Sequence, residues 1–359
     1  MKDPLVLIDG RPLVGHRTGI GVHTAEIARR LRFTPAPVIA AHAGLGDASD
    51  LDGCRVVVDK TALGVVWQQM RLPEIAAREE AAVVWGPHGT LPLRLRTPAV
   101  VSIHDLTSIT MPHRHRIKTV LSFNLLIARS LEMAEYIAAV SLTAASEIMR
   151  GFGVRSGKIT IVPNGVDEFF SPGPADGLPA RLAGKDYLLY VGTLEPRKGI
   201  DDLVRAWRAI TGRPRLVLCG SEGWGHARLR SMMEHEIEAG EIIMTGYVDR
   251  TTLRALYRGA SALVYPSRFE GFGLPPLEAM ACGTPVVATA GGAIREVVGD
   301  AAELVEVGDI DGLRQAIMTV LANESRRLEL IARGHERVEL FRWDTSAHLM
   351  RDLLRAAAR

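Results

Sequence analysis

Residues 269–283 read FEGFGLPPLEAMACG and place two carboxylates, Glu270 and Glu278, eight positions apart around a glycine turn. Because glycine has no Cβ, Gly271 and Gly273 allow the backbone to turn tightly and to approach a ligand closely. The two prolines that follow are typical of the first turn of a helix, where a missing N–H costs little. The amides left free at such a start attract anions, phosphates above all. The stretch therefore predicts a phosphate-binding helix start with a carboxylate on each side.

The two carboxylates fit either a hydrolytic acid/base pair or two separate hydroxyl clamps. Eight residues of helix span about 12 Å, whereas the paired carboxylates of sugar hydrolases lie roughly 5–9.5 Å apart. The spacing favours the clamps, with Glu270 on a sugar and Glu278 on a ribose. The structural alternative is a plain helix entry in which Glu278 only complements the helix dipole.

Length and composition are those of a globular chain with two domains. The 359 residues exceed the usual size of one domain. A net charge of +2 without a long basic block gives no indication of a nucleic-acid partner. Three widely spaced cysteines argue against a disulfide framework and indicate a reducing compartment. No apolar run reaches the roughly 20 residues that span a bilayer, and the N-terminus does not read as a signal peptide. We therefore expect a cytoplasmic protein.

Short β-rich runs alternate with longer helical patterns along the whole chain, as Ala99–Ile103 and Tyr187–Val191 illustrate. Such alternation predicts parallel, doubly wound sheets. The segment Ser171–Gly184 is rich in proline and glycine and breaks the alternation, so the domain boundary is predicted there.

Several segments resemble the family-4 retaining glycosyltransferases. Glu270 and Glu278 match the E-x7-E signature of that family. Other similar segments follow in the family's order: Ser102–Leu106, Val162–Asp167, Val191–Gly199, Val264–Ser267 and Thr284–Ala288. The resemblance implies the GT-B fold, an α/β fold in which two Rossmann-like doubly wound parallel-sheet domains hold the active site in the cleft between them. Residues 1–170 would bind the acceptor, together with a C-terminal crossing helix at about 345–359, and residues 171–344 would bind the nucleotide-sugar donor.

The resemblance also implies which residues bind the donor. The loop Gly15–Gly21 is similar to the family's N-domain loop near the donor diphosphate, with a plain turn as the alternative. A dinucleotide site is disfavoured there, because Thr24 stands where G-x-G-x-x-G needs glycine or alanine. Lys198 occupies the diphosphate-lysine position; Arg197 either replaces the basic residue missing at Thr193 or faces solvent. The donor-binding set is Gly19, Gly21, Arg197, Gly271, Phe272, Gly273, Leu274, Tyr247, Val248 and Glu278.

The catalytic residues implied in this way are Glu270, Lys198 and His104. His104 follows a predicted strand, where ligands of an open parallel sheet bind. A histidine there can donate to a developing charge or to a sugar hydroxyl, or can be hydrogen-bonded for structure alone. The backbone of Tyr247 and Val248 would line the base pocket, unless Tyr247 is a packed aromatic at the end of a strand.

No metal site and no cofactor are expected. The chain contains no zinc-type pattern, and the two D-x-D triplets, 50–52 and 309–311, lie in a glycine-containing loop and before a late helix, where capping is expected. Helix starts and Lys198 would stabilise the departing diphosphate. No covalent nucleophile is evident, so the hypothesis is a front-face attack with retention, in which the leaving phosphate oxygen accepts the acceptor's proton.

The expected function is that of a retaining, metal-independent hexosyltransferase, and the resemblance leans toward mannosyltransferase-like members that use GDP-mannose. The acceptor would be a saccharide or lipid-linked saccharide in polysaccharide or glycolipid biosynthesis. The stretch 113–129 is basic and amphipathic, and predicts either a peripheral contact with the inner face of the membrane or a core helix with a solvated basic edge. The alternatives are another GT-B enzyme, such as a UDP-sugar transferase or a sugar-nucleotide epimerase, and a non-catalytic sugar-nucleotide-binding protein.

Overall fold

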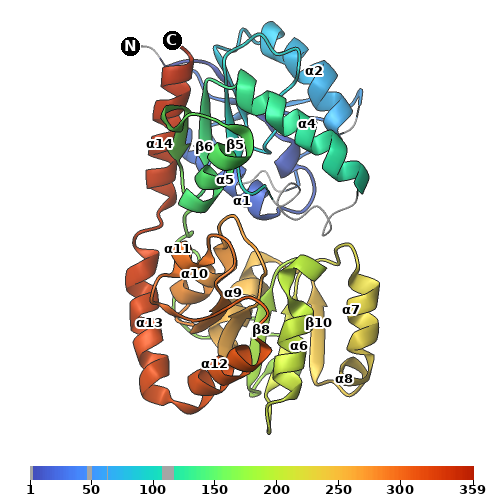
Figure 1. The fold of residues 1–359 in the computed structure, drawn as a ribbon. Helices are drawn as coiled ribbons and strands as arrows, with labels where there is room; N and C mark the ends of the chain where they lie inside the picture. Colours follow the sequence, from blue (N-terminus) through green and yellow to red (C-terminus); the bar gives the residue numbers. More distant parts are fainter. Residues whose placement is uncertain (1–2, 47–50, 63, 107–116) are drawn as a thin grey trace. The chain divides into compact units, whose positions relative to one another are not determined.

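The chain divides into two units, each built on its own parallel sheet. The computed structural model describes residues 3–46, 51–62, 64–106 and 117–359, without the side chains of 117–124. Unit 1 consists of residues Met1–Gly165 and Arg342–Arg359, and unit 2 of Val166–Phe341. Each unit is a parallel sheet covered by helices (Figure 1).

Unit 1 contains a seven-stranded sheet in the order β3-β2-β1-β4-β5-β6-β7, and every neighbouring pair is parallel. The strands are β1 (Val6–Asp9), β2 (Val38–Ala41), β3 (Arg55–Val58), β4 (Val83–Gly86), β5 (Ala99–Ile103), β6 (Tyr136–Ala139) and β7 (Ile159–Ile161). The central strands β1, β4 and β5 are buried along their whole length, as expected of parallel strands with helices on both faces, while the edge strand β3 is mostly exposed.

The C-terminal helix completes unit 1. The described residues of this unit form the helices α1 (Gly19–Leu31), α2 (Gly64–Arg78), α4 (Ile117–Met133), α5 (Leu142–Phe152) and α14 (Trp343–Ala357), with the 3-10 helices η1 (Arg11–Leu13) and η3 (Ser156–Lys158). α14 packs along α1 (Figure 1). Its inward face is apolar, with Trp343, Met350 and Leu354 buried. The last helix, predicted at about 345–359, therefore begins at Trp343 and belongs to unit 1.

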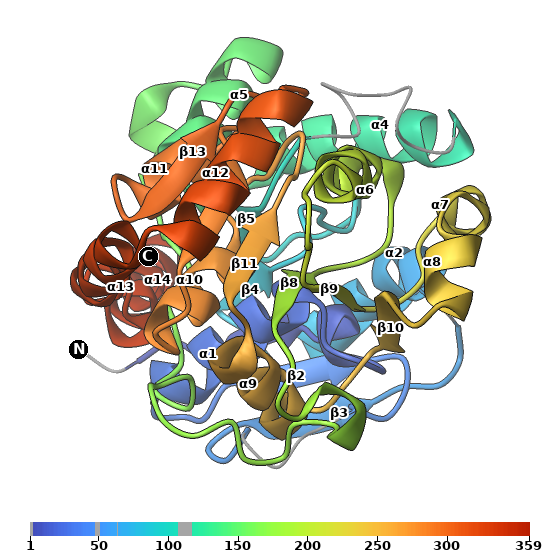
Figure 2. The ribbon, with the colours of Figure 1, turned by 90° about the horizontal axis from the view of Figure 1, so that it is seen from below.

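Unit 2 contains a six-stranded parallel sheet in the order β10-β9-β8-β11-β12-β13. The strands are β8 (Tyr187–Val191), β9 (Arg215–Cys219), β10 (Ile242–Gly246), β11 (Ala262–Tyr265), β12 (Val286–Thr289) and β13 (Ala302–Val305). The helices are η4 (Ala180–Leu182), η5 (Pro196–Lys198), α6 (Ile200–Arg208), α7 (His226–Met232), α8 (Glu234–Glu238), α9 (Arg250–Gly259), α10 (Leu274–Ala281), α11 (Ile294–Val298), α12 (Ile310–Ala322) and α13 (Glu324–Val338). Figure 2 shows α7 and α8 beside the edge strand β10.

The division between the units lies slightly before the predicted boundary. Val166 N donates to Phe341 O over 2.9 Å, so unit 2 begins there. The segment Ser171–Gly184 also belongs to unit 2, because Arg258 of α9 donates to the backbone oxygens of Ser171 and Pro174. Proline and glycine mark where the alternation of strands and helices breaks, but they do not indicate to which unit the segment belongs.

Both sheets are doubly wound, as the alternation predicts. Strand addition reverses between β1 and β4 in unit 1 and between β8 and β11 in unit 2. In open parallel sheets, ligands bind at the carboxyl ends of the strands beside such a switch point. The predicted loop Gly15–Gly21 follows β1, and the segments Gly192–Gly199 and 266–273 follow β8 and β11.

Candidate functional site

Two loops meet at the switch point of unit 2. One follows β8 at Gly192–Gly199, and the other follows β11 at residues 266–273. Gly199 has a φ of 67°, and a Cβ on it would lie 2.0 Å from the backbone oxygen of Pro266. The loops are therefore pressed together backbone to backbone, an approach that only glycine permits at position 199.

A buried ion pair lies between these loops. Lys198 Nζ donates to Glu270 Oε1 over 2.5 Å, and both residues are 7% exposed. The same oxygen accepts from the hydroxyls of Tyr265 at 2.9 Å and Ser267 at 2.6 Å. Burial raises the pKa of Glu270, but the charges of Lys198 and Arg197 outweigh it and hold the pKa below its ordinary value. Glu270 is thus a carboxylate at neutral pH, in direct contact with the second predicted catalytic residue.

Arg197 also faces this pair. Its Nε donates to Glu195 Oε2 over 3.0 Å, and its Nη1 lies 3.9 Å from Glu270 Oε2. The side chain is 16% exposed, so it does not simply project into solvent. The two cations at 197 and 198 therefore stand on the same side of the loop, where an anionic ligand would meet both charges.

Arg268 is a structural residue of the site that the sequence analysis missed. Its Nη2 donates to Asp201 at 2.9 Å and to Asp202 at 2.7 Å, and its backbone N donates to Arg197 O over 3.0 Å. It joins the loop after β11 to the start of α6. Two signals for this ion pair stand in the sequence: a basic residue close before Glu270, and two aspartates in the first turn of a helix. The aspartates alone are also explained by the helix dipole, which favours acidic residues in a first turn.

Glu278 lies on α10 in a different environment. Tyr257 Oη donates to Glu278 Oε2 over 2.8 Å. Burial raises the pKa of Glu278 to about 7, and the Tyr257 bond and the charge of Arg250 offset this only in part. Arg250 itself pairs with Asp167 at 2.8 Å. One carboxylate of the E-x7-E segment is thus ionised beside cations and the other is close to its midpoint, each with its own partners, which suits two clamps.

The loop after β12 fixes the backbone of Glu270. Ala293 N donates to Glu270 O over 2.8 Å, and Gly292 pairs with Glu270 as an isolated parallel bridge. Gly292 has a φ of 65°, and a Cβ on it would lie 2.2 Å from that oxygen. Thr289 Oγ1 adds a hydrogen bond of 2.5 Å to Ser267 O. A third loop therefore fixes the backbone at Ser267 and Glu270.

The helix predicted from the opening stretch begins where expected. α10 starts at Leu274, with prolines in its first turn, and Gly273 is its N-cap with a φ of 111°. Gly271 is buried within the turn. Phe272 is 6% exposed, and its ring packs edge-on against Phe341 with centroids 5.7 Å apart. The ring of Phe272 thus belongs to the core, which leaves its backbone for the predicted donor contact.

Tyr247 and Val248 follow β10, beside the loop after β9. Tyr247 is 48% exposed, which excludes the packed-aromatic alternative, and Val248 is half-buried. Gly220 N donates to Gly246 O over 3.0 Å and joins the two loops. The base-pocket role of this turn stays a prediction.

The glycine loop of unit 1 differs in detail from the expectation. α1 begins at Gly19, inside the predicted loop Gly15–Gly21, with Thr18 as N-cap. A Cβ on Gly21 would lie 2.6 Å from the backbone oxygen of Pro12, so the packing of α1 on η1 requires this glycine. Gly21 thus has a packing role, and the diphosphate contacts predicted for Gly19 and Gly21 stay predictions.

His104 lies half-buried at the carboxyl end of β5. Its Nε2 is 2.9 Å from Pro87 O. Since a carbonyl only accepts, Nε2 carries the proton and Nδ1 of the neutral ring keeps its lone pair. Burial lowers the pKa of His104 to about 4, so the ring is neutral at pH 7. In this tautomer Nδ1 can accept from a hydroxyl, and the catalytic role of His104 stays a prediction.

A buried polar network that the sequence analysis missed lies at the switch point of unit 1. Asp9 and Gln68 are 0% exposed, and Gln68 Nε2 donates to Asp9 Oδ2 over 3.0 Å. Arg11 donates to Asp9 at 3.0 Å and to Thr90 Oγ1 at 3.2 Å. The network fixes the loop after β4, whose backbone holds the imidazole of His104. Isolated polar residues far apart in sequence gave no motif from which to predict it.

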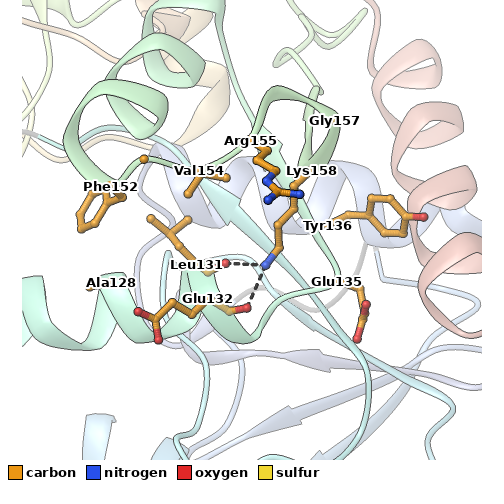
Figure 3. A pocket seen from close by; sticks show the side chains of 11 residues that line it. Ala128, Leu131, Glu132, Glu135, Tyr136, Phe152, Val154, Arg155, Gly157 and Lys158 are labelled. Carbon is orange, nitrogen blue, oxygen red and sulfur yellow. Dashed lines mark hydrogen bonds between the residues drawn. The ribbon is translucent and has the colours of Figure 1, made fainter.

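A cavity of about 510 Å³ opens elsewhere in unit 1 (Figure 3). It is lined by Ala128, Leu131, Glu132, Glu135, Tyr136, Phe152, Gly153, Val154, Arg155, Gly157 and Lys158. Lys158 Nζ donates to the backbone oxygens of Leu131 and Glu132, each at 2.8 Å, and so caps α4 (Figure 3). The cavity lies at the amino ends of β6 and β7, opposite to the edge that carries His104, and is not part of the candidate site.

In the described part of the chain, no group of three or more His, Cys, Asp or Glu side chains is placed to hold a metal ion. Asp309 caps α12 by accepting from Gly312 N over 2.9 Å, as its position before a helix predicts. None of the described helices is both long and apolar enough to cross a membrane. Most of the predicted membrane-contact stretch 113–129 falls outside the residues whose side chains are described.

Comparisons with known protein families cover both units. The family described as "Glycosyltransferase Family 4" matches residues 17–168, and "Glycosyl transferases group 1" matches residues 180–337. The chain is 37% identical to O-antigen chain mannosyltransferase B of Escherichia coli over 268 residues, which are 72% of this chain and 70% of that protein.

Solved structures resemble the whole chain. Sucrose-phosphate synthase from Thermosynechococcus elongatus superposes with a TM-score of 0.80 at 25% identity over 99% of both chains. The Anabaena protein HepE, in complex with UDP and glucose, has a TM-score of 0.77 at 19% identity over 98% of both chains. The second likeness is one of fold alone. Together with the two parallel sheets, these structures confirm the predicted GT-B type of fold.

Proposed function

The chain belongs to glycosyltransferase family 4, and from that premise we propose that it moves a hexose from a nucleoside diphosphate sugar to a saccharide or lipid-linked saccharide. The observation that carries the proposal is the buried contact of Lys198 with Glu270 at the switch point of unit 2. A cation and a sugar-binding carboxylate there meet a helix start, which is the combination that a sugar diphosphate needs.

The diphosphate competes with Glu270 for Lys198. Its oxygens accept from Lys198, from Arg197 and from the amides at the start of α10. Glu270 is then available to accept from a hydroxyl of the sugar, while Tyr265 and Ser267 continue to hold one of its oxygens. Glu278 accepts from the ribose hydroxyls in the same way.

In the transfer step, the bond from the anomeric carbon to the diphosphate oxygen breaks, and a bond from the acceptor hydroxyl oxygen forms on the same face. The acceptor's proton passes to the departing phosphate oxygen. Lys198 and the helix start offset the negative charge that develops on the diphosphate. His104 accepts from a substrate hydroxyl through Nδ1 and orients it. We propose that anomeric configuration is retained and that neither a metal ion nor another cofactor takes part.

Mannose from GDP-mannose is the proposed donor. The relative that shares 37% of aligned residues is named as a mannosyltransferase of O-antigen chains, which supports mannose and a polysaccharide or glycolipid acceptor. HepE was solved with UDP, so a UDP-sugar is the second candidate donor. A lipid-linked acceptor would place the enzyme at the cytoplasmic face of a membrane.

Nucleotide binding and transfer can be tested separately. In a thermal-shift panel of GDP, UDP and ADP, we expect GDP to raise the melting temperature most and Glu278→Ala to remove the shift. Purified protein with GDP-mannose and an acceptor panel should yield a product that keeps the donor's anomeric configuration, with the same rate in EDTA. Absence of any nucleoside diphosphate shift would overturn the proposal, and a stable glycosyl adduct on Glu270 in intact-mass spectra would overturn the mechanism.

A further inference from the structure

His23 is a buried polar side chain for which the proposed function has no task. It lies on α1 and is 0% exposed, and its Nδ1 is 2.7 Å from Asn164 Oδ1. Its ring stands at 87° to that of His104, with centroids 4.6 Å apart. Trp85 and Trp343 pack edge-on against the same imidazole at 5.9 and 6.1 Å. His23 thus lies between the candidate histidine of β5 and the start of α14.

The hydrogen bonds fix the tautomers of both histidines. The amide oxygen of Asn164 only accepts, so His23 carries its proton on Nδ1 and has a lone pair on Nε2. That Nε2 is buried and has no hydrogen-bond partner among the residues that the structure describes. His104 donates from Nε2 to a carbonyl and keeps its lone pair on Nδ1. The two rings therefore carry their protons on opposite nitrogens.

An imidazole is a costly choice for this place. A buried acceptor without a hydrogen-bond partner destabilises the folded state, and an apolar ring would fill the space without that penalty. Burial and the neighbouring His104 keep the pKa of His23 well below its ordinary value, so the ring is neutral. What the imidazole adds over an apolar ring is the hydrogen bond to Asn164, which fixes the plane of the ring.

We propose that His23 is a positioning residue for His104: Asn164 locks the plane of the His23 ring, and the edge-to-face contact of the two rings holds His104 in the orientation that presents its Nδ1 lone pair. This also gives a task to Asn164, which is 4% exposed. The inference rests on the proposed function only where it assigns His104 a substrate hydroxyl.

The first test reads the tautomers directly. In spectra of the full-length protein labelled with ¹⁵N in histidine, we expect His23 to be neutral with its proton on Nδ1 at pH 7, and His104 neutral with its proton on Nε2. His23→Phe and His104→Ala assign the signals. A proton on Nε2 of His23, or a charged His23 ring, would overturn the inference without any variant having to fold for function.

The second test separates the ring from its anchor. His23→Phe keeps an aromatic ring but loses the Asn164 bond, and His23→Leu loses both, so we expect kcat to fall about 10-fold and about 100-fold. Donor KM should stay within about 3-fold, because a displaced catalytic group affects the transition state more than ground-state binding. His348→Gln, at an exposed site, is the matched control.

The two tests distinguish a positioning role of His23 from a packing role and from failure of the proposed role of His104. A folded His23→Leu protein with wild-type kcat and unmoved His104 signals would refute the positioning role. If His104→Ala retained full activity, the role of His104 in the proposed function would fail, while the spectra would still judge whether His23 orients it. Loss of melting temperature in His23→Leu alone, with unmoved His104 signals in His23→Phe, would reduce His23 to a packing residue.

Discussion

One carboxylate oxygen of Glu270 accepts several hydrogen bonds in unit 2. Oε1 accepts from Lys198, Tyr265 and Ser267 at once. Removing two charges from water is costly, and a buried ion pair repays that cost only when further hydrogen bonds satisfy its atoms. The two hydroxyls do this for Glu270. The arrangement therefore holds Glu270 as a carboxylate in a buried site, where its charge acts strongly on a ligand.

Replacing Lys198 by Met should destabilise the protein and abolish transfer. The uncompensated Glu270 charge would cost about 3–5 kcal/mol of unfolding free energy. Adding Glu270→Gln removes that charge, so the double variant should regain most of the stability but none of the activity. Urea denaturation and a transfer assay on the three proteins check this. A single variant as stable as the wild type would mean that the pair is not buried in solution.

Glu278 gives a pH dependence of the opposite sign to that of an ordinary surface carboxylate. Its pKa is about 7 in the folded chain against a reference of 4.5, so the folded state holds a proton that the unfolded state releases between these values. This stabilising contribution is complete below the unfolded pKa and is lost as pH rises through 7. Glu278→Gln cannot ionise, so its stability relative to the wild type should increase from pH 5 to pH 8 by on the order of 2 kcal/mol.

Denaturation curves at several pH values measure this difference, and the exposed Glu168, replaced by Gln in the same way, controls for the loss of one carboxylate. A difference that is constant with pH would place Glu278 in water. The same variant should bind GDP more weakly, because an amide oxygen is a poorer acceptor than a carboxylate. Stability and nucleotide affinity would then change in opposite directions.

Residue spacing predicts the two carboxylates as site residues, but it does not predict which side chains surround them. Glu270, Glu278 and Lys198 stand in recognisable local patterns, and the structure brings Glu270 and Lys198 into contact across 72 positions of sequence. Arg268 and Tyr257 act through partners that are distant in the chain, so no local pattern marks them. The tautomer of His104 could not be predicted from the sequence either, because tertiary structure alone places the Pro87 carbonyl that accepts from its ring.

Strands were the most predictable elements. Buried parallel strands are apolar on both faces and read as short continuous runs of β-branched and aliphatic residues, so β5 and β8 have the predicted bounds. Helix starts were less predictable. α1 begins at Gly19, inside the predicted loop Gly15–Gly21, and the sequence does not reveal that Gly21 packs against Pro12 O. The sequence marks the positive-φ glycines of the loops as turns. Which of these glycines supports the site depends on the neighbouring strand, and the sequence does not show that.

Gly292 gives a test at the level of the loop after β12. Gly292→Ala forces a Cβ to within 2.2 Å of Glu270 O, whereas Gly212→Ala, at a nearly equal φ of 64° against 65°, meets nothing within 4 Å. Both variants carry the left-handed strain of about 1–2 kcal/mol, and only the first displaces the Glu270 backbone, for about 1–3 kcal/mol more. We expect transfer to fall about 100-fold in Gly292→Ala alone. Equal activities of the two variants would show that the loop does not position Glu270.

At the scale of the molecule, unit 1 is assembled from two separate parts of the chain. Residues 1–165 supply the sheet, and 342–359 return to cover it with α14. The sequence predicted this return only through the family resemblance, since an amphipathic C-terminal helix has no local mark of the unit it covers. The contact between the parts is close: a Cβ on Gly165 would lie 2.3 Å from Trp343 N. The end of the first part therefore touches the start of the second.

This contact predicts that unit 1 folds without unit 2. A chain in which residues 1–165 are joined to 342–359 by a linker of about four glycine and serine residues should unfold cooperatively, because the linker has only to bridge adjacent backbones. Residues 1–165 alone should not unfold cooperatively, because the apolar surface that α14 covers would be exposed to water. In the joined chain, Met350→Ala at a fully buried position should cost about 2–5 kcal/mol. Circular dichroism during thermal unfolding decides, and a cooperative transition of equal midpoint in residues 1–165 alone would mean that α14 contributes nothing to the core.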